Sequence, residues 1–172
     1  MEEGIGMIRL VKIDAKNALD VGALKVKRSQ RHFVDNNKNS IIDAYTTIGT
    51  NCTAFPFGIY NDDEPVGFIM IGFNEAVMYE YWFDDLKAPE VYRNNYTIWR
   101  FMIDKRYQHR GYGREALKLA LKFVKTLPCG EAEYCALSYS GRNKSAKEFY
   151  RSFGFVENGE KDGGEIVAVL KL

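Results

Sequence analysis

Apolar and polar residues alternate along several short stretches of the chain, and these stretches predict β-strands. Residues 7–13 alternate apolar and basic side chains, as a strand with one buried face does. Residues 53–60 and 66–73 are apolar and aromatic, and the turn sequence between them predicts a hairpin in which Pro65 closes the turn. Residues 96–104 are almost entirely apolar and predict a buried strand.

Apolar residues at helical spacing predict two amphipathic helices in the second half of the chain. The first apolar stripe runs from Leu117 to Val124 at positions i, i+3, i+4 and i+7. The second stripe runs from Ala146 to Phe153, and Gly154 is the residue expected to end that helix.

Two shorter helices are predicted in the first third of the chain. Asp14 is placed to cap a helix over residues 15–24, and Ser40 to cap a helix that holds residues 41–45. Residues 74–95 are aromatic and acidic without a regular period, so we expect irregular structure there.

Three further strands complete the pattern. Residues 133–140 predict one strand, and residues 155–158 and 165–172 predict a closing hairpin. The order of elements is typical of an α/β (α+β) domain around a mixed sheet with a right-handed crossover. Because no repeat or linker divides the sequence, we expect one domain over residues 1–172.

The composition excludes several classes of function. A net charge of +1 at pH 7 is too small for broad binding to nucleic acid or to an anionic membrane, so we expect neither partner. The apolar runs are too short to span a bilayer, and the acidic N-terminus has no signal-peptide pattern. With three cysteines in no CxxC pair and two histidines, we expect reduced thiols, no metal site and a cytoplasmic protein.

The segment from Arg106 to Leu117, RYQHRGYGREAL, combines basic side chains and glycines just before a predicted helix. The start of a helix exposes backbone N–H groups at the positive end of the helix dipole, and these attract an anion. Gly111 and Gly113 allow the backbone to approach that anion, and the nearby arginines add positive charge. The segment matches neither a P-loop nor a dinucleotide fingerprint, and by itself it also fits a solvated turn.

A second motif lies downstream of the first. Gln108, Gly111 and Gly113 fill the pattern Q/R-x-x-G-x-G/A, and residues 143–155 fill the pattern N-x-x-A-x-x-F-Y-x-x-x-G-F. In this order, with a predicted strand between them, the two motifs resemble the GCN5-related N-acetyltransferase (GNAT) family, and the resemblance covers nearly the whole chain. It implies the GNAT fold, a mixed, mostly antiparallel central sheet flanked by helices, with splayed central strands.

Within that family, three stretches look most like bacterial spermine/spermidine (diamine) acetyltransferases. These stretches are residues 98–113, residues 158–172 and residues 43–45, the last apart from Asp43. Members more commonly have glycine where this chain has His109, so we expect a bulky ring at the rim of the anion site.

The resemblance implies acetyl-CoA as the cosubstrate and a role for individual residues. Backbone amides of residues 109–114 would hold the pyrophosphate, residues 101–103 would pair with the pantetheine arm, and Asn143 would contact that arm. Tyr150 takes the position of the general acid that protonates the leaving thiolate. The cofactor-binding residues implied in this way are Phe101, Met102, Ile103, Gln108, His109, Arg110, Gly111, Tyr112, Gly113, Arg114 and Asn143.

The general base stays open. Related polyamine acetyltransferases carry an acidic residue where this chain has Trp99, and an indole accepts no proton. The proton of the amine would then leave through ordered water to Glu80, to Asp84 or to a backbone carbonyl.

Acidic and aromatic side chains gather between residues 75 and 85 and are candidates for binding the acceptor. Carboxylates attract a polycation, and aromatic rings can hold a methylene chain or an ammonium group. The same side chains also fit a solvated loop, a core or a dimer interface. The substrate residues expected from this segment are Glu75, Glu80, Trp82 and Asp84.

Three functions fit the sequence. The first is an acetyl-CoA-dependent N-acetyltransferase, working as a homodimer on a small-molecule amine such as spermine or spermidine. The second has the same fold but acetylates a protein amine or an amine drug. The third is a non-catalytic acyl-CoA-binding module, which Trp99 supports and Tyr150 argues against.

Overall fold

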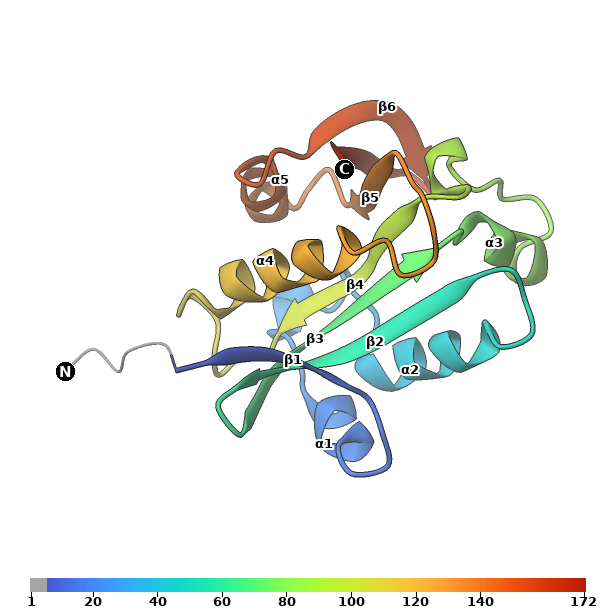
Figure 1. Ribbon diagram of the computed structural model, residues 1–172. Helices are drawn as coiled ribbons and strands as arrows, with labels where there is room; N and C mark the ends of the chain where they lie inside the picture. Colours follow the sequence, from blue (N-terminus) through green and yellow to red (C-terminus); the bar gives the residue numbers. More distant parts are fainter. Residues whose placement is uncertain (1–5) are drawn as a thin grey trace.

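A seven-stranded sheet with helices on both faces makes up the protein, as the computed structural model describes it for residues 6–172 (Figure 1). The N-terminal stretch whose acidic character argued against a signal peptide includes residues 1–5, which lie outside the described residues. The strands are β1 (Ile8–Lys12), β2 (Thr53–Asn61), β3 (Glu64–Phe73), β4 (Tyr96–Ile103), β5 (Tyr134–Tyr139), β6 (Val156–Asp162) and β7 (Glu165–Lys171). The helices are α1 (Ala18–Ala23), α2 (Asn37–Thr46), α3 (Ala76–Trp82), α4 (Tyr112–Val124) and α5 (Lys144–Arg151), with short 3-10 turns at Arg28–Gln30 and Glu90–Tyr92.

The strand order β1-β2-β3-β4-β5-β7-β6 contains one parallel pair, β4 with β5, and is otherwise antiparallel. In the described chain β4 and β5 pair at two positions, Tyr96 with Cys135 and Thr97 with Ala136, and the strands separate beyond them. The predicted fold, a mixed and mostly antiparallel sheet with splayed central strands, is therefore confirmed.

A bulge in β4 lies where the strands begin to separate. The β3–β4 register passes from Ile71 opposite Ile98 to Met70 opposite Arg100, which leaves Trp99 as the extra residue. Because a bulge bends its strand and increases the local twist, it helps to turn the end of β4 away from β5.

Helices cover both faces of the sheet, so both faces are buried. Successive residues of a strand point to opposite faces. Ile69 of β3 packs in the cluster that contains Leu117 of α4, whereas its neighbour Phe68 packs with Val21 of α1. The apolar stripe predicted from Leu117 to Val124 is buried against the sheet, and its prediction is confirmed.

The predicted caps of the first two helices are wrong. Asn17 accepts a hydrogen bond from the Asp14 amide and donates to the Lys12 carbonyl, so α1 begins only after Asn17. Asn36 caps α2 by accepting from the Asn39 amide, and Ser40 lies buried inside that helix.

Two other expectations need correction. Pro65 lies in β3 opposite Tyr60, beside an irregularity in the register, while Asp62 takes the positive φ of 52° in the turn. The segment over residues 74–95 is not irregular throughout, because it contains α3. Tyr79 of α3 is buried with residues of β5 and β7. This tertiary contact stabilises the helix without producing a helical period in the local sequence.

Candidate active site

The gap between β4 and β5 forms a cleft of about 280 Å³, which we call the interstrand cleft. β4 contributes its last three residues, and α5 contributes residues from the opposite side (Figure 1). Six of the predicted site residues line it: Phe101, Met102, Ile103, Gln108, Asn143 and Tyr150.

The loop before α4 has the backbone shape that the glycine pattern predicts. Gly111 precedes the first residue of α4 with a φ of 83°, a left-handed conformation that glycine adopts without a Cβ clash. His109 also has a positive φ, 65°, so the position where relatives more commonly carry glycine is one that suits glycine. Tyr112 begins the helix and is buried, which fixes the exposed N–H groups beside the interstrand cleft.

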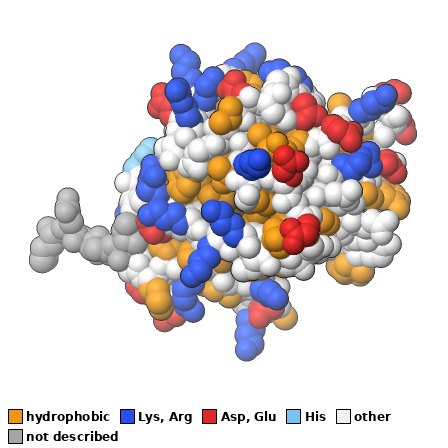
Figure 2. Space-filling model, turned by 45° about the horizontal axis from the view of Figure 1, so that its top comes forward, with side chains coloured by type: hydrophobic (Ala, Val, Ile, Leu, Met, Phe, Trp, Pro, Cys, Tyr) orange, Lys and Arg blue, Asp and Glu red, His pale blue; other side chains and the backbone are white. Residues whose placement is uncertain are grey.

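Two arginines lie in or next to this loop, and each contacts a nearby aromatic ring. The Arg110 guanidinium lies 5.8 Å from the ring centre of Tyr107. Arg114 donates to the Ser152 hydroxyl at 3.1 Å and lies over the ring of Phe153. Acidic and basic side chains are interspersed on the face shown in Figure 2, so positive charge near the start of α4 is a local feature.

Gln108 joins the loop to β4. Its Nε2 donates to the Ile103 carbonyl at 3.0 Å and to Oε1 of Gln30 at 2.9 Å. Its own Oε1 is buried and has no hydrogen-bond partner among the described residues. A buried acceptor of this kind at the wall of a cleft is suited to a donor supplied by a ligand.

Asn143 caps the start of α5. Its Oδ1 accepts from the Ala146 amide at 3.1 Å and so caps α5. The same side chain lines the interstrand cleft, so its Nδ2 is the group able to contact a bound molecule.

Tyr150 lies between the interstrand cleft and a second cavity of about 360 Å³, which we call the junction cavity. Its ring stacks on Tyr139 with ring centres 6.1 Å apart. Burial, and to a lesser extent the nearby charge of Glu165, raise the pKa of the Tyr150 hydroxyl well above its usual value. The hydroxyl therefore stays protonated near neutral pH.

A third cavity of about 480 Å³ adjoins the junction cavity, and we call it the acidic cleft. Four carboxylates line it, from α2, from the residue before α3, from β6 and from β7, together with two tryptophans and one arginine. These residues are Asp43, Glu75, Asp162, Glu165, Trp82, Trp99 and Arg100. Trp99, Arg100, Ser138 and Glu165 line both the acidic cleft and the junction cavity.

Hydroxyl groups hold two of the carboxylates. Asp162 accepts from the Tyr79 hydroxyl at 2.6 Å and from the Tyr92 hydroxyl at 3.1 Å. Ser138 donates to Oε2 of Glu165 at 2.7 Å. These bonds fix the two acidic residues on either side of the β6–β7 turn.

Glu75 is buried, with 4% of its surface exposed. Burial raises the pKa of its carboxyl to about 8, against the partly compensating attraction of Arg100. Near neutral pH the side chain is therefore largely neutral while the site holds no further cation.

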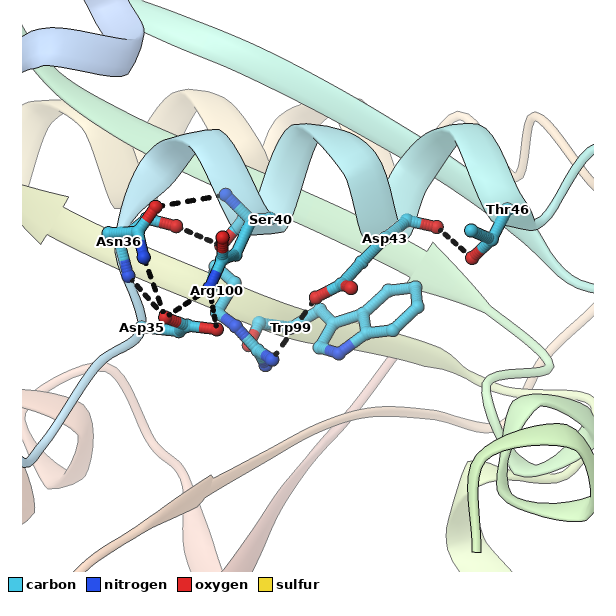
Figure 3. Close-up of polar contacts among 8 residues, drawn as sticks. Asp35, Asn36, Ser40, Asp43, Thr46, Trp99 and Arg100 are labelled. Atoms are coloured by element: carbon cyan, nitrogen blue, oxygen red, sulfur yellow. Dashed lines mark hydrogen bonds and ion pairs between the residues drawn. The ribbon is translucent and has the colours of Figure 1, made fainter.

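Arg100 is the single arginine that lines the acidic cleft. It extends from β4 toward Asp43 of α2, with N···O at 3.7 Å, and donates to the Trp99 carbonyl at 2.9 Å (Figure 3). Trp99 in turn packs against Trp82, with ring centres 5.5 Å apart. Two tryptophan rings therefore lie beside the carboxylates.

The structure brings only part of the predicted acceptor site together. Glu75 and Trp82 line the acidic cleft, whereas Glu80 and Asp84 are exposed and belong to none of the three cavities described here. Sequence reasoning missed Asp43, Asp162 and Glu165, which arrive from α2 and from the closing hairpin. The available signals were the stretches 43–45 and 158–172, quoted above for their resemblance.

Two further searches concern metals and membranes. Within residues 6–172, no three histidine, cysteine, aspartate or glutamate side chains gather closely enough to hold a metal ion. Over the same residues, no helix combines the length and apolar character needed to cross a membrane.

A sheet parted between its central strands, beside a helix start with exposed N–H groups, is the fold of acyltransferases that use acetyl-CoA. The chain belongs to the GNAT acetyltransferase family, whose family model matches residues 24–155. Membership confirms the resemblance drawn from the two motifs, with N-acetyl transfer as the reaction class and acetyl-CoA as the cosubstrate.

Known proteins similar to this chain fall in the same class. The spermine/spermidine N(1)-acetyltransferase of Bacillus subtilis is 30% identical over 167 residues, covering 96% of this chain and 99% of that protein. Among solved structures, the PaiA N-acetyltransferase of Thermoplasma acidophilum in complex with coenzyme A matches with a TM-score of 0.61 at 17% identity, over 96% of this chain and 99% of that one. An acetyltransferase of Thermus thermophilus matches with a TM-score of 0.68 at 20% identity, over 98% and 99%.

Proposed function

We propose that the protein transfers the acetyl group of acetyl-CoA to a primary amine of a polyamine such as spermidine or spermine. The observation that carries this proposal is the acidic cleft, whose four carboxylates adjoin the cavity that Tyr150 lines. The similarity to a spermine/spermidine acetyltransferase over nearly the full length of both chains supports the same acceptor.

The interstrand cleft has groups that fit acetyl-CoA. N–H groups at the start of α4 would hold its pyrophosphate, with Arg110 and Arg114 adding charge. The β4 backbone beyond Thr97 has no paired residue on the β5 side within the described chain, and it would pair with the pantetheine arm. The unpartnered Oε1 of Gln108 is a further acceptor at this wall. Acetyl-CoA supplies the activated thioester carbonyl.

The acidic cleft would hold the acceptor. One ammonium group faces several carboxylates there, while Trp82 and Trp99 offer ring faces to a methylene chain or to a second ammonium group. The Arg100–Asp43 pair leaves Glu75, Asp162 and Glu165 as the carboxylates that a polycation would neutralise.

Tyr150 would act at the other side of the reacting centre. Its hydroxyl stays protonated near neutral pH because burial and Glu165 raise its pKa. The Oη proton is thus available to the leaving sulfur. Sulfur leaves more readily when it is protonated than as a bare thiolate.

The acceptor can be tested with kcat/KM for spermine and for a monoamine of similar length, in the wild type and in Glu75→Gln/Asp162→Asn. We expect the wild type to prefer spermine. The double variant should raise KM for spermine by roughly tenfold, because Asp162 and Glu75, which a bound ammonium group would ionise, can no longer pair with the acceptor. Salt should raise the same KM by screening. The monoamine should respond less to both changes.

A matched control is available on the surface. Glu80→Gln/Asp84→Asn makes the same two kinds of substitution at exposed residues outside the acidic cleft, and it should leave the KM for spermine close to the wild-type value. Equal kcat/KM for spermine and monoamine in the wild type would refute the polyamine proposal and favour an amine drug or a protein amine as acceptor.

A further inference from the structure

Glu165 lines both the acidic cleft and the junction cavity. It is the first residue of β7, and it shares the junction cavity with Trp99 of β4 on the other side of the splayed sheet. Tyr150 lines the same cavity, close enough for the charge of Glu165 to act on the Tyr150 hydroxyl. A carboxylate and a protonated phenol therefore meet where the acidic cleft reaches the interstrand cleft.

The surroundings of Glu165 orient it. Ser138 of β5 donates to its Oε2 at 2.7 Å, which leaves Oε1 able to accept a proton. Ser138 lines all three cavities, so the oriented carboxylate lies at their meeting point. The ionisable groups that share its two cavities come from α2, α3, β4, β6, α5 and the segment before α2; they are Asp43, Glu75, Tyr79, Arg100, Asp162, Tyr150, Arg31, His32 and Asp35.

We propose that Glu165 is the general base that accepts the proton of the acceptor ammonium. This inference rests on the proposed amine acetylation. Two protons leave the acceptor nitrogen as ammonium becomes amide. The first goes to Glu165 and then to solvent, and the second returns to the Tyr150 oxygen after Tyr150 has given its own proton to the sulfur. The C–N bond forms and the C–S bond breaks, so the products are the acetylated amine, free thiol and one released proton.

Other proton acceptors in the junction cavity are less well placed. Asp35 accepts from the Asn36 amide at 2.7 Å and from the Asn39 side chain, so it stabilises the start of α2. His32 is exposed, with its ring against Phe33. Glu75 does not line the junction cavity, and Asp162 is held by two tyrosine hydroxyls.

The test compares two acceptors of equal length: a diamine, and its analogue with a difluoromethylene group beside the reacting amino group, which makes that amine far less basic and leaves a large fraction of it neutral at neutral pH. Glu165→Gln should lower kcat for the ordinary diamine by about a hundredfold to a thousandfold, and its pH profile should rise toward the pKa of the amine. The fluorinated diamine should lose less than tenfold, because it needs little deprotonation. Tyr150→Phe should slow both acceptors alike, since both use the same leaving sulfur.

Asp35→Asn and His32→Gln replace the rival acceptors and should retain the wild-type preference and pH profile. In Glu165→Ala, added formate should restore part of kcat for the ordinary diamine, and this readout remains if the glutamine variant folds poorly. Equal losses for both diamines, an unchanged pH profile or the absence of formate rescue would overturn the assignment of Glu165. A wild type that acetylates neither diamine would instead overturn the proposed function.

Discussion

Glu75 is the buried carboxyl whose protonation the fold changes most clearly. The side chain is 4% exposed, and burial raises its pKa from 4.5 to about 8. In the unfolded chain the same carboxyl ionises near its usual value, so between these two pH values the folded protein binds more protons than the unfolded one. Glu75 therefore contributes stability that is fully present below about pH 4.5 and is lost as the pH rises to about 8.

Replacing Glu75 by glutamine should remove this loss. We expect the Tm of the wild type to fall more than that of Glu75→Gln between about pH 5 and about pH 8, because glutamine cannot ionise. Thermal unfolding of both proteins across this range measures the difference. Glu80→Gln, an exposed change on the same helix, should follow the wild type; parallel curves for wild type and Glu75→Gln would contradict the expectation.

The loop that leads into α4 places a histidine in a conformation that suits glycine. His109 has a φ of 65°, and a Cβ there costs about 1 kcal/mol relative to glycine. The loop keeps this shape because Gln108 is bonded to β4 on one side and the buried Tyr112 begins the helix on the other. The Cβ of His109 therefore lowers the stability of the folded protein relative to a glycine at this position.

His109→Gly should therefore raise the free energy of unfolding by up to about 1 kcal/mol, or the Tm by roughly 2–4 °C for a chain of this size. His109→Ala keeps the Cβ and should give little or no gain, so it separates the backbone effect from loss of the ring. Thermal unfolding of the three proteins decides, and equal gains for alanine and glycine would show that the conformation of His109 is not the cause.

Sequence pattern predicted the elements with the strongest period. The strand over residues 96–104 and the helical stripe from Leu117 were correct, because each buries one continuous apolar surface. The caps at Asp14 and Ser40 were wrong, since several asparagines, serines and aspartates near a helix start can each accept its N–H bonds and only tertiary packing selects one.

The sequence predicted site residues that are close together along the chain, and missed those that come together only in the folded structure. The interstrand cleft uses neighbouring residues from two local motifs, and half of the predicted cofactor-binding and catalytic residues line it. The acidic cleft collects Asp43, Glu75, Asp162 and Glu165 from elements more than a hundred residues apart, and no local pattern relates their side chains. Glu80 and Asp84 are acidic like the residues of the acidic cleft, but they are exposed and lie outside it.

At the scale of the whole molecule, the sheet has two parts that meet weakly. Strands β1 to β4 form one part and β5, β7 and β6 the other, and two pairs of residues, at Tyr96 and Thr97 of β4, join them. A molecule bound along the gap would supply contacts to both parts. Coenzyme A should therefore stabilise the junction more than the outer strands.

We expect coenzyme A to slow amide hydrogen exchange at residues 101–103 and at the start of α4, because backbone N–H groups there would gain partners. Amides of β2, which is paired on both sides, should change less. Gly111→Asp places a carboxylate where the pyrophosphate would bind, and it should abolish the protection. Full protection in that variant would show that the pyrophosphate does not lie against Gly111.

The order β5-β7-β6 also constrains how the chain can fold as it leaves the ribosome. β6 is synthesised before β7, yet β7 lies between β6 and β5 and pairs with both. While residues 165–171 are still inside the ribosomal tunnel, β6 has no partner and β5 has an open edge on that side. Glu165 and the rest of the acidic cleft thus come together late in synthesis, after the interstrand motifs have already emerged.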